Sequence, residues 1–365
     1  SVNGNLFPNP AGAGQPVAGP SSLTLPNSNL KPMRASEKEI GIELKMFQNR
    51  IGLDFAAYQK ITNDQIVSAQ VSDGSGYTST LINSGKSRTN GLEMLLNLVP
   101  IKTGSFQWDL SFNGSLNNTK VLKLLTETPG ERITVGTHVF NGELRQVVGQ
   151  PMGQIYGFGY ARDPQGRIIF GGNGIATRTS DLISFGSALP KWTGGINNGI
   201  SYKNFTLSFL IDFKLGNNML SGTNFNAVRH GLHKITLPGR EGIIGEGVIK
   251  QPDGSFITNT VKANNQDYWS VVRSLALIEP VVYNGGFWKL RQITAGYDLT
   301  KLLPATSPIK ALKLSLVANN VLMLKKWVPN IDPDSFGYSS DNLVGMESTG
   351  LPTTRSVGFN LNVKF

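Results

Sequence analysis

The sequence contains no cysteine, which excludes a disulfide framework, a thiolate metal site and a cysteine nucleophile. It also lacks any run of about 18 consecutive apolar residues, the length that a transmembrane helix needs, so transmembrane helices are excluded. Charge is sparse as well, because charged residues make up 16% of the chain against about 25% in typical soluble domains.

What is present is glycine, small polar residues and dispersed apolar residues. There are 42 glycines, hydrophobic residues make up 39% of the chain, and the mean hydropathy is -0.12. This composition suits a transmembrane β-barrel, which has an apolar lipid face and a polar lumen, although a soluble β-sandwich or propeller has a similar composition. The net charge of +10 is scattered, with no basic run longer than Lys325-Lys326, so a nucleic-acid partner is not expected.

Apolar and polar residues alternate over many strand-length segments, which places them on opposite faces of a sheet. The clearest alternation covers residues 106–117, where every position on the second face is polar, as expected for contact with water. Another segment slips in its alternation near Leu290, which predicts a β-bulge. The alternation predicts about nine strands, near residues 40–46, 51–57, 92–98, 106–117, 193–202, 205–215, 287–299, 311–320 and 356–365.

The connections between these strands alternate between short and long. The short ones lie near residues 49–50, 99–104, 203–204 and 300–309, and the long ones near 61–80, 118–191, 216–285 and 321–354. Outer-membrane barrels have short periplasmic turns and long extracellular loops, whereas soluble sandwiches seldom have loops of this length. The sequence therefore predicts an all-β, transmembrane antiparallel β-barrel.

The ends of the chain fit one orientation of such a barrel. Residues 1–33, rich in Pro and Gly, are expected to form an extracellular loop, and residues 34–365 the strands. An odd number of strands does not make a complete bacterial barrel, and open edges are prohibitive in lipid. We therefore expect partner strands from further sequence or from another chain.

Ser1 does not open a signal peptide, so we expect the natural start upstream. The apolar segment 155–160 is expected to fold in or over the barrel.

Several short motifs follow one another along the chain. They are Asn29-Leu30-Lys31-Pro32, Glu39-Ile40-Gly41-Ile42-Glu43, Asn90-Gly91-Leu92-Glu93, Gly149-Gln150-Pro151-Met152-Gly153, Leu189-Pro190-Lys191-Trp192-Thr193-Gly194-Gly195, Tyr202-Lys203-Asn204-Phe205, Phe287-Trp288-Lys289-Leu290-Arg291, Asn319-Asn320, Asp332-Pro333 and the terminal Pro352, Arg355 and Phe365. In this order they resemble the SusC/RagA-like TonB-dependent transporters of the Gram-negative outer membrane. Met33 stands where that family usually has Glu, and Asn284 lies near a position where an acid is common.

The resemblance implies the C-terminal region of a 22-stranded outer-membrane barrel plugged by an N-terminal domain, which this sequence does not contain. Such a protein imports a large nutrient, a glycan or a peptide, with energy from TonB. TonB would engage the missing N-terminal region, and a SusD-like surface lipoprotein would cap the barrel amid outer-membrane lipid and lipopolysaccharide. The alternative is a SusC-like structural or assembly subunit without its own transport cycle. An upstream plug with a TonB-contacting segment would distinguish the two.

No arrangement of residues predicts catalysis, so the chain is not expected to be an enzyme or to hold a cofactor. A surface glycosidase would need paired carboxylates, and the loop acids Asp253 and Asp267 show no such spacing. His230 and His233 lack an obvious carboxylate partner and are interpreted as surface-loop residues. The Asp332-Pro333-Asp334 segment has oxygen ligands for Ca²⁺ but is interpreted as a turn. No metal site is expected.

The aromatic residues divide into two groups. Tyr268, Trp269 and Trp327, and also Trp288, are candidates for stacking on a substrate or a partner, because Tyr268 and Trp269 occupy the largest loop. The second group consists of expected membrane-interface anchors, namely Trp108, Trp192 and the terminal Phe365.

Overall fold

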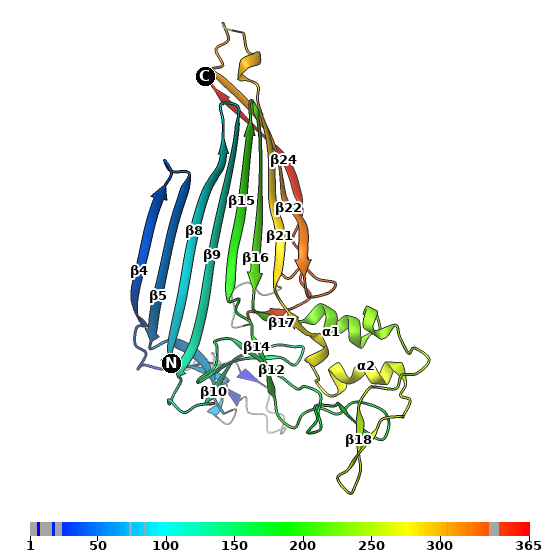
Figure 1. The fold of residues 1–365 in the computed structure, drawn as a ribbon. Coiled ribbons are helices and arrows are strands. Elements are labelled where there is room, and N and C mark those ends of the chain that lie inside the picture. The colour runs from blue at the N-terminus through cyan, green and yellow to red at the C-terminus, as the bar shows by residue number, and fades with distance from the viewer. Residues whose placement is uncertain are drawn as a thin grey trace.

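A computed structural model describes residues 6–7, 17–18, 24–72, 75–83, 85–304, 306–335 and 343–365. Nine long antiparallel strands form one open, curved sheet (Figure 1). In the order along the chain they are β4 (Arg34–Met46), β5 (Ile51–Asn63), β8 (Lys86–Lys102), β9 (Phe106–Lys123), β15 (Trp192–Tyr202), β16 (Phe205–Leu215), β21 (Phe287–Asp298), β22 (Ala311–Lys326) and β24 (Ser356–Lys364).

Each strand pairs with its neighbour in sequence, so the sheet is an up-and-down meander from β4 to β24. The expected all-β, antiparallel architecture is confirmed. The edge strands β4 and β24 do not pair with one another, so the described strands do not close into a barrel. The expected total of 22 strands stays a prediction.

The short turns all lie at the end of the sheet that carries the C-terminus, and the long connections lie at the other end (Figure 1). One short connection contains the 3-10 helix η4 (Thr300–Leu302). The two-residue turn at Lys203 has a positive φ of 53° at that residue, as hairpin turns of this length commonly require.

The long connections fold into small sheets and helices. Their strands are β1 (Leu6–Phe7), β2 (Val17–Ala18), β3 (Thr24–Leu25), β6 (Ile66–Gln70), β7 (Ser79–Asn83), β10 (Arg132–Thr137), β11 (Glu143–Val147), β12 (Gln154–Gly157), β13 (Ile169–Phe170), β14 (Ile183–Ser187), β17 (Asn218–Ser221), β18 (Val248–Lys250), β19 (Phe256–Thr258), β20 (Val282–Asn284) and β23 (Met346–Glu347). Their helices are α1 (Gly222–Arg229), α2 (Asn265–Ser274) and the 3-10 helices η2 (Lys234–Thr236) and η3 (Glu279–Val281).

The connections after β9, β16 and β22 share one hydrophobic core. The first contributes Leu144 and Ile155, the second Val228 and Ile278, and the third Met346. Ile155 is fully buried on β12, which pairs with β11 and β14 beyond the ends of the long strands. The apolar segment 155–160 therefore begins in this core, which we call the loop domain after the connections that build it.

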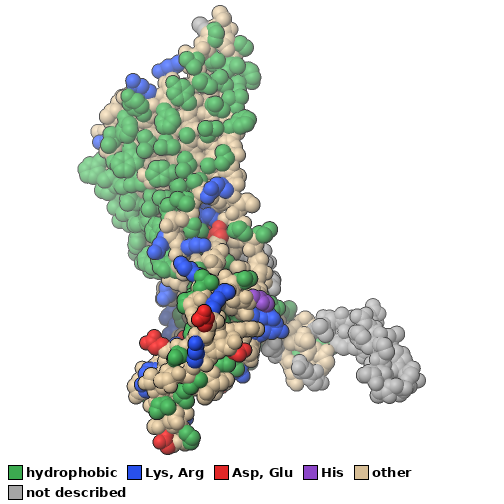
Figure 2. All heavy atoms as spheres, turned by 90° about the vertical axis from the view of Figure 1, so that its right-hand side faces the viewer, with side chains coloured by type: hydrophobic (Ala, Val, Ile, Leu, Met, Phe, Trp, Pro, Cys, Tyr) green, Lys and Arg blue, Asp and Glu red, His purple; other side chains and the backbone are tan. Residues whose placement is uncertain are grey.

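The sheet presents an exposed apolar face. Ile40 is 76% exposed, Leu316 59% and Phe359 77%, and Figure 2 shows hydrophobic side chains covering the strands while charged side chains gather mainly over the loop domain. Soluble monomers rarely expose a continuous apolar patch larger than roughly a few hundred Å², so an apolar surface that extends across many strands is unusual for them. Within the described residues no helix is long and apolar enough to span a membrane.

Candidate functional site: the inner wall and the loop domain

The opposite face of the sheet is polar and hollow. A cavity of about 710 Å³ is lined by the carboxylates of Glu39, Asp54, Glu93 and Asp212 together with amide and hydroxyl groups from β9 and β15. A second cavity of about 520 Å³ shares Glu39 and Glu93 with the first. The two faces therefore differ in chemistry from β4 to β16, as the alternation in the sequence predicts.

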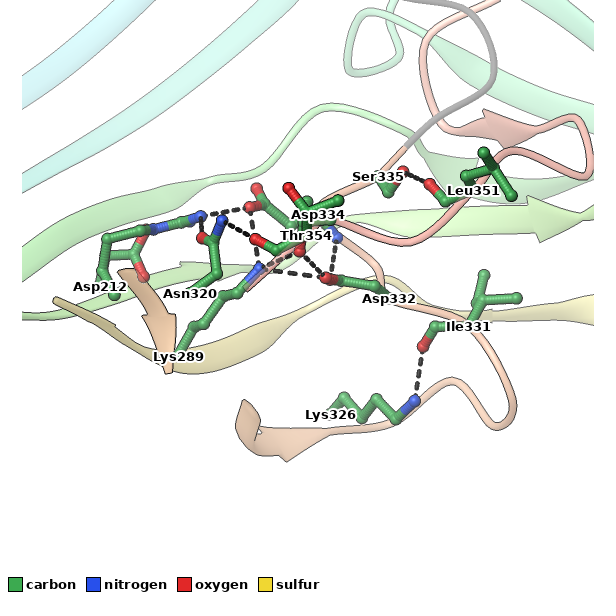
Figure 3. Close-up of polar contacts among 12 residues, drawn as sticks. Asp212, Lys289, Asn320, Lys326, Ile331, Asp332, Asp334, Ser335, Leu351 and Thr354 are labelled. Atoms are coloured by element: carbon green, nitrogen blue, oxygen red, sulfur yellow. Dashed lines mark hydrogen bonds and ion pairs between the residues drawn. The ribbon is translucent and has the colours of Figure 1, made fainter. Parts of the chain in front are cut away.

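A network of charged side chains joins this inner wall to the connection between β22 and β24 (Figure 3). The Nζ of Lys289 lies 3.0 Å from Oδ2 of Asp332, 3.4 Å from Oδ2 of Asp334 and 2.8 Å from Oγ1 of Thr353. The Lys289 side chain is only 3% exposed. A cation this deeply buried needs its partners, because an unpaired buried charge is strongly destabilising.

Arg291 completes the network because of a β-bulge. Leu290 pairs with Ile211 and Gln292 with Leu210, so Arg291 is the extra residue on β21. Its guanidinium donates from Nη1 to Asp334 at 2.6 Å and from Nε to Asp212 at 3.0 Å. The bulge predicted from the slipped alternation is confirmed, and it directs Arg291 toward the loop.

Both loop carboxyls are held in their charged form. Burial alone would raise the pKa of Asp334, but the hydrogen bond and charge of Arg291, with further charge from Lys214 and Lys289, lower it below its ordinary value. For Asp332, burial is likewise outweighed by the hydrogen bonds from Thr353, the Asp334 backbone and Lys289, so its pKa is also lowered. We call these residues and their cationic partners the loop latch.

The hydrogen bonds of the loop latch test the turn interpretation of the Asp332-Pro333-Asp334 segment. The Asp334 N–H donates to Asp332 Oδ1 at 3.0 Å and the Ser335 N–H to the Asp332 carbonyl at 3.0 Å, which confirms a turn. The carboxylates of Asp332 and Asp334 face Lys and Arg instead of converging on an empty space. Within the described residues no cluster of three or more metal-ligating side chains occurs.

A buried carboxylate ties the same connection to α1. Glu347 is 1% exposed and accepts hydrogen bonds from Ser221 Oγ at 3.0 Å, from the Thr223 N–H at 2.9 Å and from the Gly350 N–H at 3.2 Å. A carboxylate at a helix N-terminus satisfies backbone donors that have no partner within the helix. The connection is thus attached both to the wall and to the loop domain.

The three candidate contact aromatics have different environments. Trp269 on α2 is half-buried against the core of the loop domain, with its ring edge-on to Tyr268 at 5.1 Å between centroids. Tyr268 is also stacked with Phe170 at 6.2 Å, and burial raises its pKa. Trp327 is 43% exposed just after β22, so it is the most accessible of the three.

Trp288 lies apart from the other candidate contact aromatics. Its ring stacks on Phe213 at 4.5 Å between centroids, and Phe213 in turn faces Phe112 at 6.5 Å. Trp288 and Phe213 are register partners, and their row continues through Gly194 on β15. Phe112 on β9 lies one pair of residues away from this row, on the same apolar face of the sheet. Trp288 therefore packs on the outer face and does not line the inner wall.

The expected interface aromatics lie at the two ends of the sheet. Trp192 begins β15 at the loop end and is 48% exposed. Trp108 pairs with Ile200 near the turn end, and Phe365 ends the chain there at 81% exposure. Ile200 lies eight residues beyond Trp192 on β15, which is about 27 Å along an antiparallel strand.

The two loop histidines are not equivalent. His230 follows α1 and is exposed, but His233 is only 4% exposed and accepts a hydrogen bond at Nδ1 from the Ile235 N–H at 3.1 Å. The surface-loop interpretation is therefore wrong for His233, because its imidazole caps η2 within the loop domain, and burial lowers its pKa.

Sequence reasoning named Lys289, Arg291, Asp332 and Asp334 but missed the contacts between them, and it missed the buried Glu347 altogether. The slip near Leu290 located the bulge but did not name Arg291 as its product. One signal could have indicated the latch, namely the two cations Lys289 and Arg291 on β21, which lie opposite Asp212 on β16. A strand that lined the wall with neutral residues alone would not carry two such charges. Nothing in the sequence around Glu347 indicates that donors from Ser221 and Thr223, more than 120 residues away, converge on it.

The family-model comparison matches residues 2–321 to "TonB dependent receptor-like, beta-barrel". TonB-dependent receptor P3 of Formosa agariphila is 24% identical over 385 residues, covering 96% of this chain and 36% of that protein. TonB-dependent receptor SusC of Bacteroides thetaiotaomicron is 25% identical over 203 residues, covering 52% of this chain and 20% of SusC. The chain thus spans about a third or less of the relatives that it matches.

Among solved structures, the RagAB peptide transporter superposes with a TM-score of 0.71 at 17% identity, covering 100% of this chain and 38% of that chain. This likeness establishes the same fold. Together with the family model and the sequence relatives, it shows that this chain belongs to the TonB-dependent receptor-like β-barrel family and is SusC/RagA-like.

Proposed function

We propose that this chain forms part of the wall and mouth of an importer in the outer membrane of a Gram-negative bacterium, with a large nutrient, a glycan or a peptide, as its substrate. The observation that supports this most is the two-faced sheet, apolar on one side and polar and hollow on the other. A wall between lipid and an aqueous lumen needs these two faces.

In this proposal the strands of residues 34–365 cross the membrane, and residues 1–33 form an extracellular loop. Trp192 would lie at the outer interface and Trp108 and Phe365 at the periplasmic interface. The separation of about 27 Å along the strand suits an apolar band of about 25 Å when the strands are tilted. Outer-membrane lipid and lipopolysaccharide would then contact the apolar face.

The loop domain is the proposed place where the substrate and a SusD-like surface lipoprotein meet the barrel. Trp327 is exposed there, and Tyr268 and Trp269 lie within the same domain. Energy would come from TonB acting on a region outside this sequence. The RagAB transporter, which shares this fold, is described as a peptide transporter, and SusC is a TonB-dependent receptor.

The second candidate function is that of a structural or assembly subunit without a transport cycle. The observation that favours this candidate is that β4 and β24 are the edges of the described sheet. Another chain could supply the strands that such edges need in lipid. The mass of the denatured chain purified from outer membranes separates the two candidates. A mass more than twice 39.5 kDa supports the importer, and a mass of 39.5 kDa supports the subunit.

Import itself is tested by uptake. A strain without the gene is compared with the complemented strain on a panel of labelled oligosaccharides and peptides, with and without a protonophore that removes the energy source of TonB. We expect one class of substrate to lose energy-dependent uptake in the deletion strain and to regain it on complementation. Unchanged uptake of the whole panel would contradict the importer.

A further inference from the structure

A cavity of about 510 Å³ lies between α1 and α2 in the loop domain, separate from the inner wall. Its volume is within the range of small-molecule sites. The residues that give it its chemistry are Arg229, His230, Arg240, Asn264, Gln266 and Trp269.

The charge of this cavity has one sign. Two guanidinium groups line it, and no carboxylate is among its lining residues in the described chain. The side chain of Arg229 has no hydrogen bond or ion pair with any described residue, whereas Arg240 donates from Nη2 to the Gly231 carbonyl at 2.7 Å. The Arg229 guanidinium is therefore available to an anion, and Arg240 has further donors that no described residue uses.

The other polar groups are suited to hydroxyls. Asn264 uses its Oδ1 to accept from the Gln266 N–H at 2.8 Å, and its side-chain N–H groups have no partner among the described residues. The side chain of Gln266 has no partner among the described residues. Amides can both donate to and accept from a hydroxyl, which a purely cationic site cannot do.

The apolar part of the cavity is an aromatic ring in a fixed position. Trp269 packs against the core of the loop domain and against Tyr268. Apart from Trp269, Val228 is the only large apolar residue among the described residues of the lining. A flat ring beside amides fits a pyranose, whereas an apolar peptide side chain would need a deeper apolar pocket.

We propose that this cavity binds an acidic oligosaccharide, with Arg229 and Arg240 on its carboxylates, the amides of Asn264 and Gln266 on its hydroxyls, and Trp269 beside a sugar ring. This inference rests on the proposed import function and names the substrate class of the loop domain. Arg is well matched to a carboxylate because its planar fork donates two parallel hydrogen bonds.

The test is calorimetric titration of the full-length protein in detergent with trigalacturonate and, for comparison, neutral maltotriose. We expect trigalacturonate to bind at least about tenfold more tightly than maltotriose. Arg229→Gln should weaken trigalacturonate binding by about tenfold or more, as expected for the loss of charged hydrogen bonds. Gln266→Ala should weaken it less.

Arg273→Gln is the matched control. Arg273 lies on α2, is exposed, and is not part of the cavity lining, so the variant has the same change in net charge. It should bind trigalacturonate as the unsubstituted protein does. Equal losses in both variants, equal affinity for the neutral sugar, or Arg229-dependent binding of an acidic tripeptide instead of the sugar would overturn the proposal.

The two proposals fail in different ways. Normal energy-dependent uptake of another substrate class, with no binding of trigalacturonate, would overturn the acidic-sugar site and leave the import function standing. Conversely, the purified protein could bind trigalacturonate while deletion of the gene leaves uptake of every substrate unchanged. That result would support the site and contradict the import function.

Discussion

At the scale of single residues, glycines in the long strands give room to aromatic rings from neighbouring strands. A Cβ at Gly91 would lie 2.2 Å from Cζ of Tyr58, and one at Gly194 would lie 2.8 Å from Cζ of Phe213. The Tyr58 ring crosses over β8 at Gly91, and its hydroxyl donates to Asn117 on β9. Two short motifs of the family resemblance thus have a physical reason, which is the close approach of a ring to the backbone.

Replacing Gly91 by Ala should therefore destabilise the protein. The added methyl group displaces the Tyr58 ring and breaks its hydrogen bond to Asn117, and overpacking of this kind costs about 1–3 kcal/mol. Urea unfolding of the protein in lipid vesicles measures the change. Gly358→Ala is the control, because a Cβ there meets nothing within 4 Å. Equal stability of the two variants would contradict this role for Gly91.

At the scale of elements, the bulge on β21 shows how far sequence reasoning reaches. The slip in alternation predicted the bulge because side-chain direction in a strand has a period of two. The loop latch that the bulge serves was not predictable, because Asp332 and Asp334 meet β21 only through tertiary folding. The same reason applies to the loop domain, where α1, α2 and β12 are stabilised by contacts between three separate connections.

The loop latch should be stable to mild acid. The pKa values of Asp332 and Asp334 are lowered in the folded state, so their contribution is complete above the unfolded value of about 3.9 and is lost as the pH falls through the lowered pKa values. Hydrogen exchange of residues 343–355, corrected for intrinsic rates, should be constant from about pH 7 to pH 5 and should rise only below about pH 4.

Asp334→Asn reproduces the loss of charge at neutral pH. This variant should show fast exchange in residues 343–355 at pH 7, because Arg291, Lys214 and Lys289 lose a charged partner. Asp253→Asn is the control, since Asp253 lies in the β18–β19 hairpin and its side chain bonds to Ser255 alone among the described residues. A loop that opens near pH 6, or an Asp334→Asn variant that exchanges like the control, would rule out the latch.

At the scale of the whole molecule, the sequence and the structure agree on a two-faced, antiparallel sheet with short turns at one end and long connections at the other. The regular alternation made this predictable, because successive side chains of a strand point to opposite faces, so alternating apolar and polar residues produce one apolar and one polar face. The number of strands in the closed barrel was not predictable in this way, since closure depends on strands that would pair with β4 and β24.

The central claim is that one face of the sheet contacts lipid and the other contacts water. Because the sequence has no cysteine, single cysteines can be placed at Leu316, on the exposed apolar face, and at the adjacent Ser315, on the inner face. Spin labels at the two sites, in protein reconstituted into lipid, report accessibility to apolar oxygen and to a water-soluble nickel chelate. The account predicts that the label at position 316 is reached by oxygen and that at 315 by the chelate. Equal access of the chelate to both positions would contradict it.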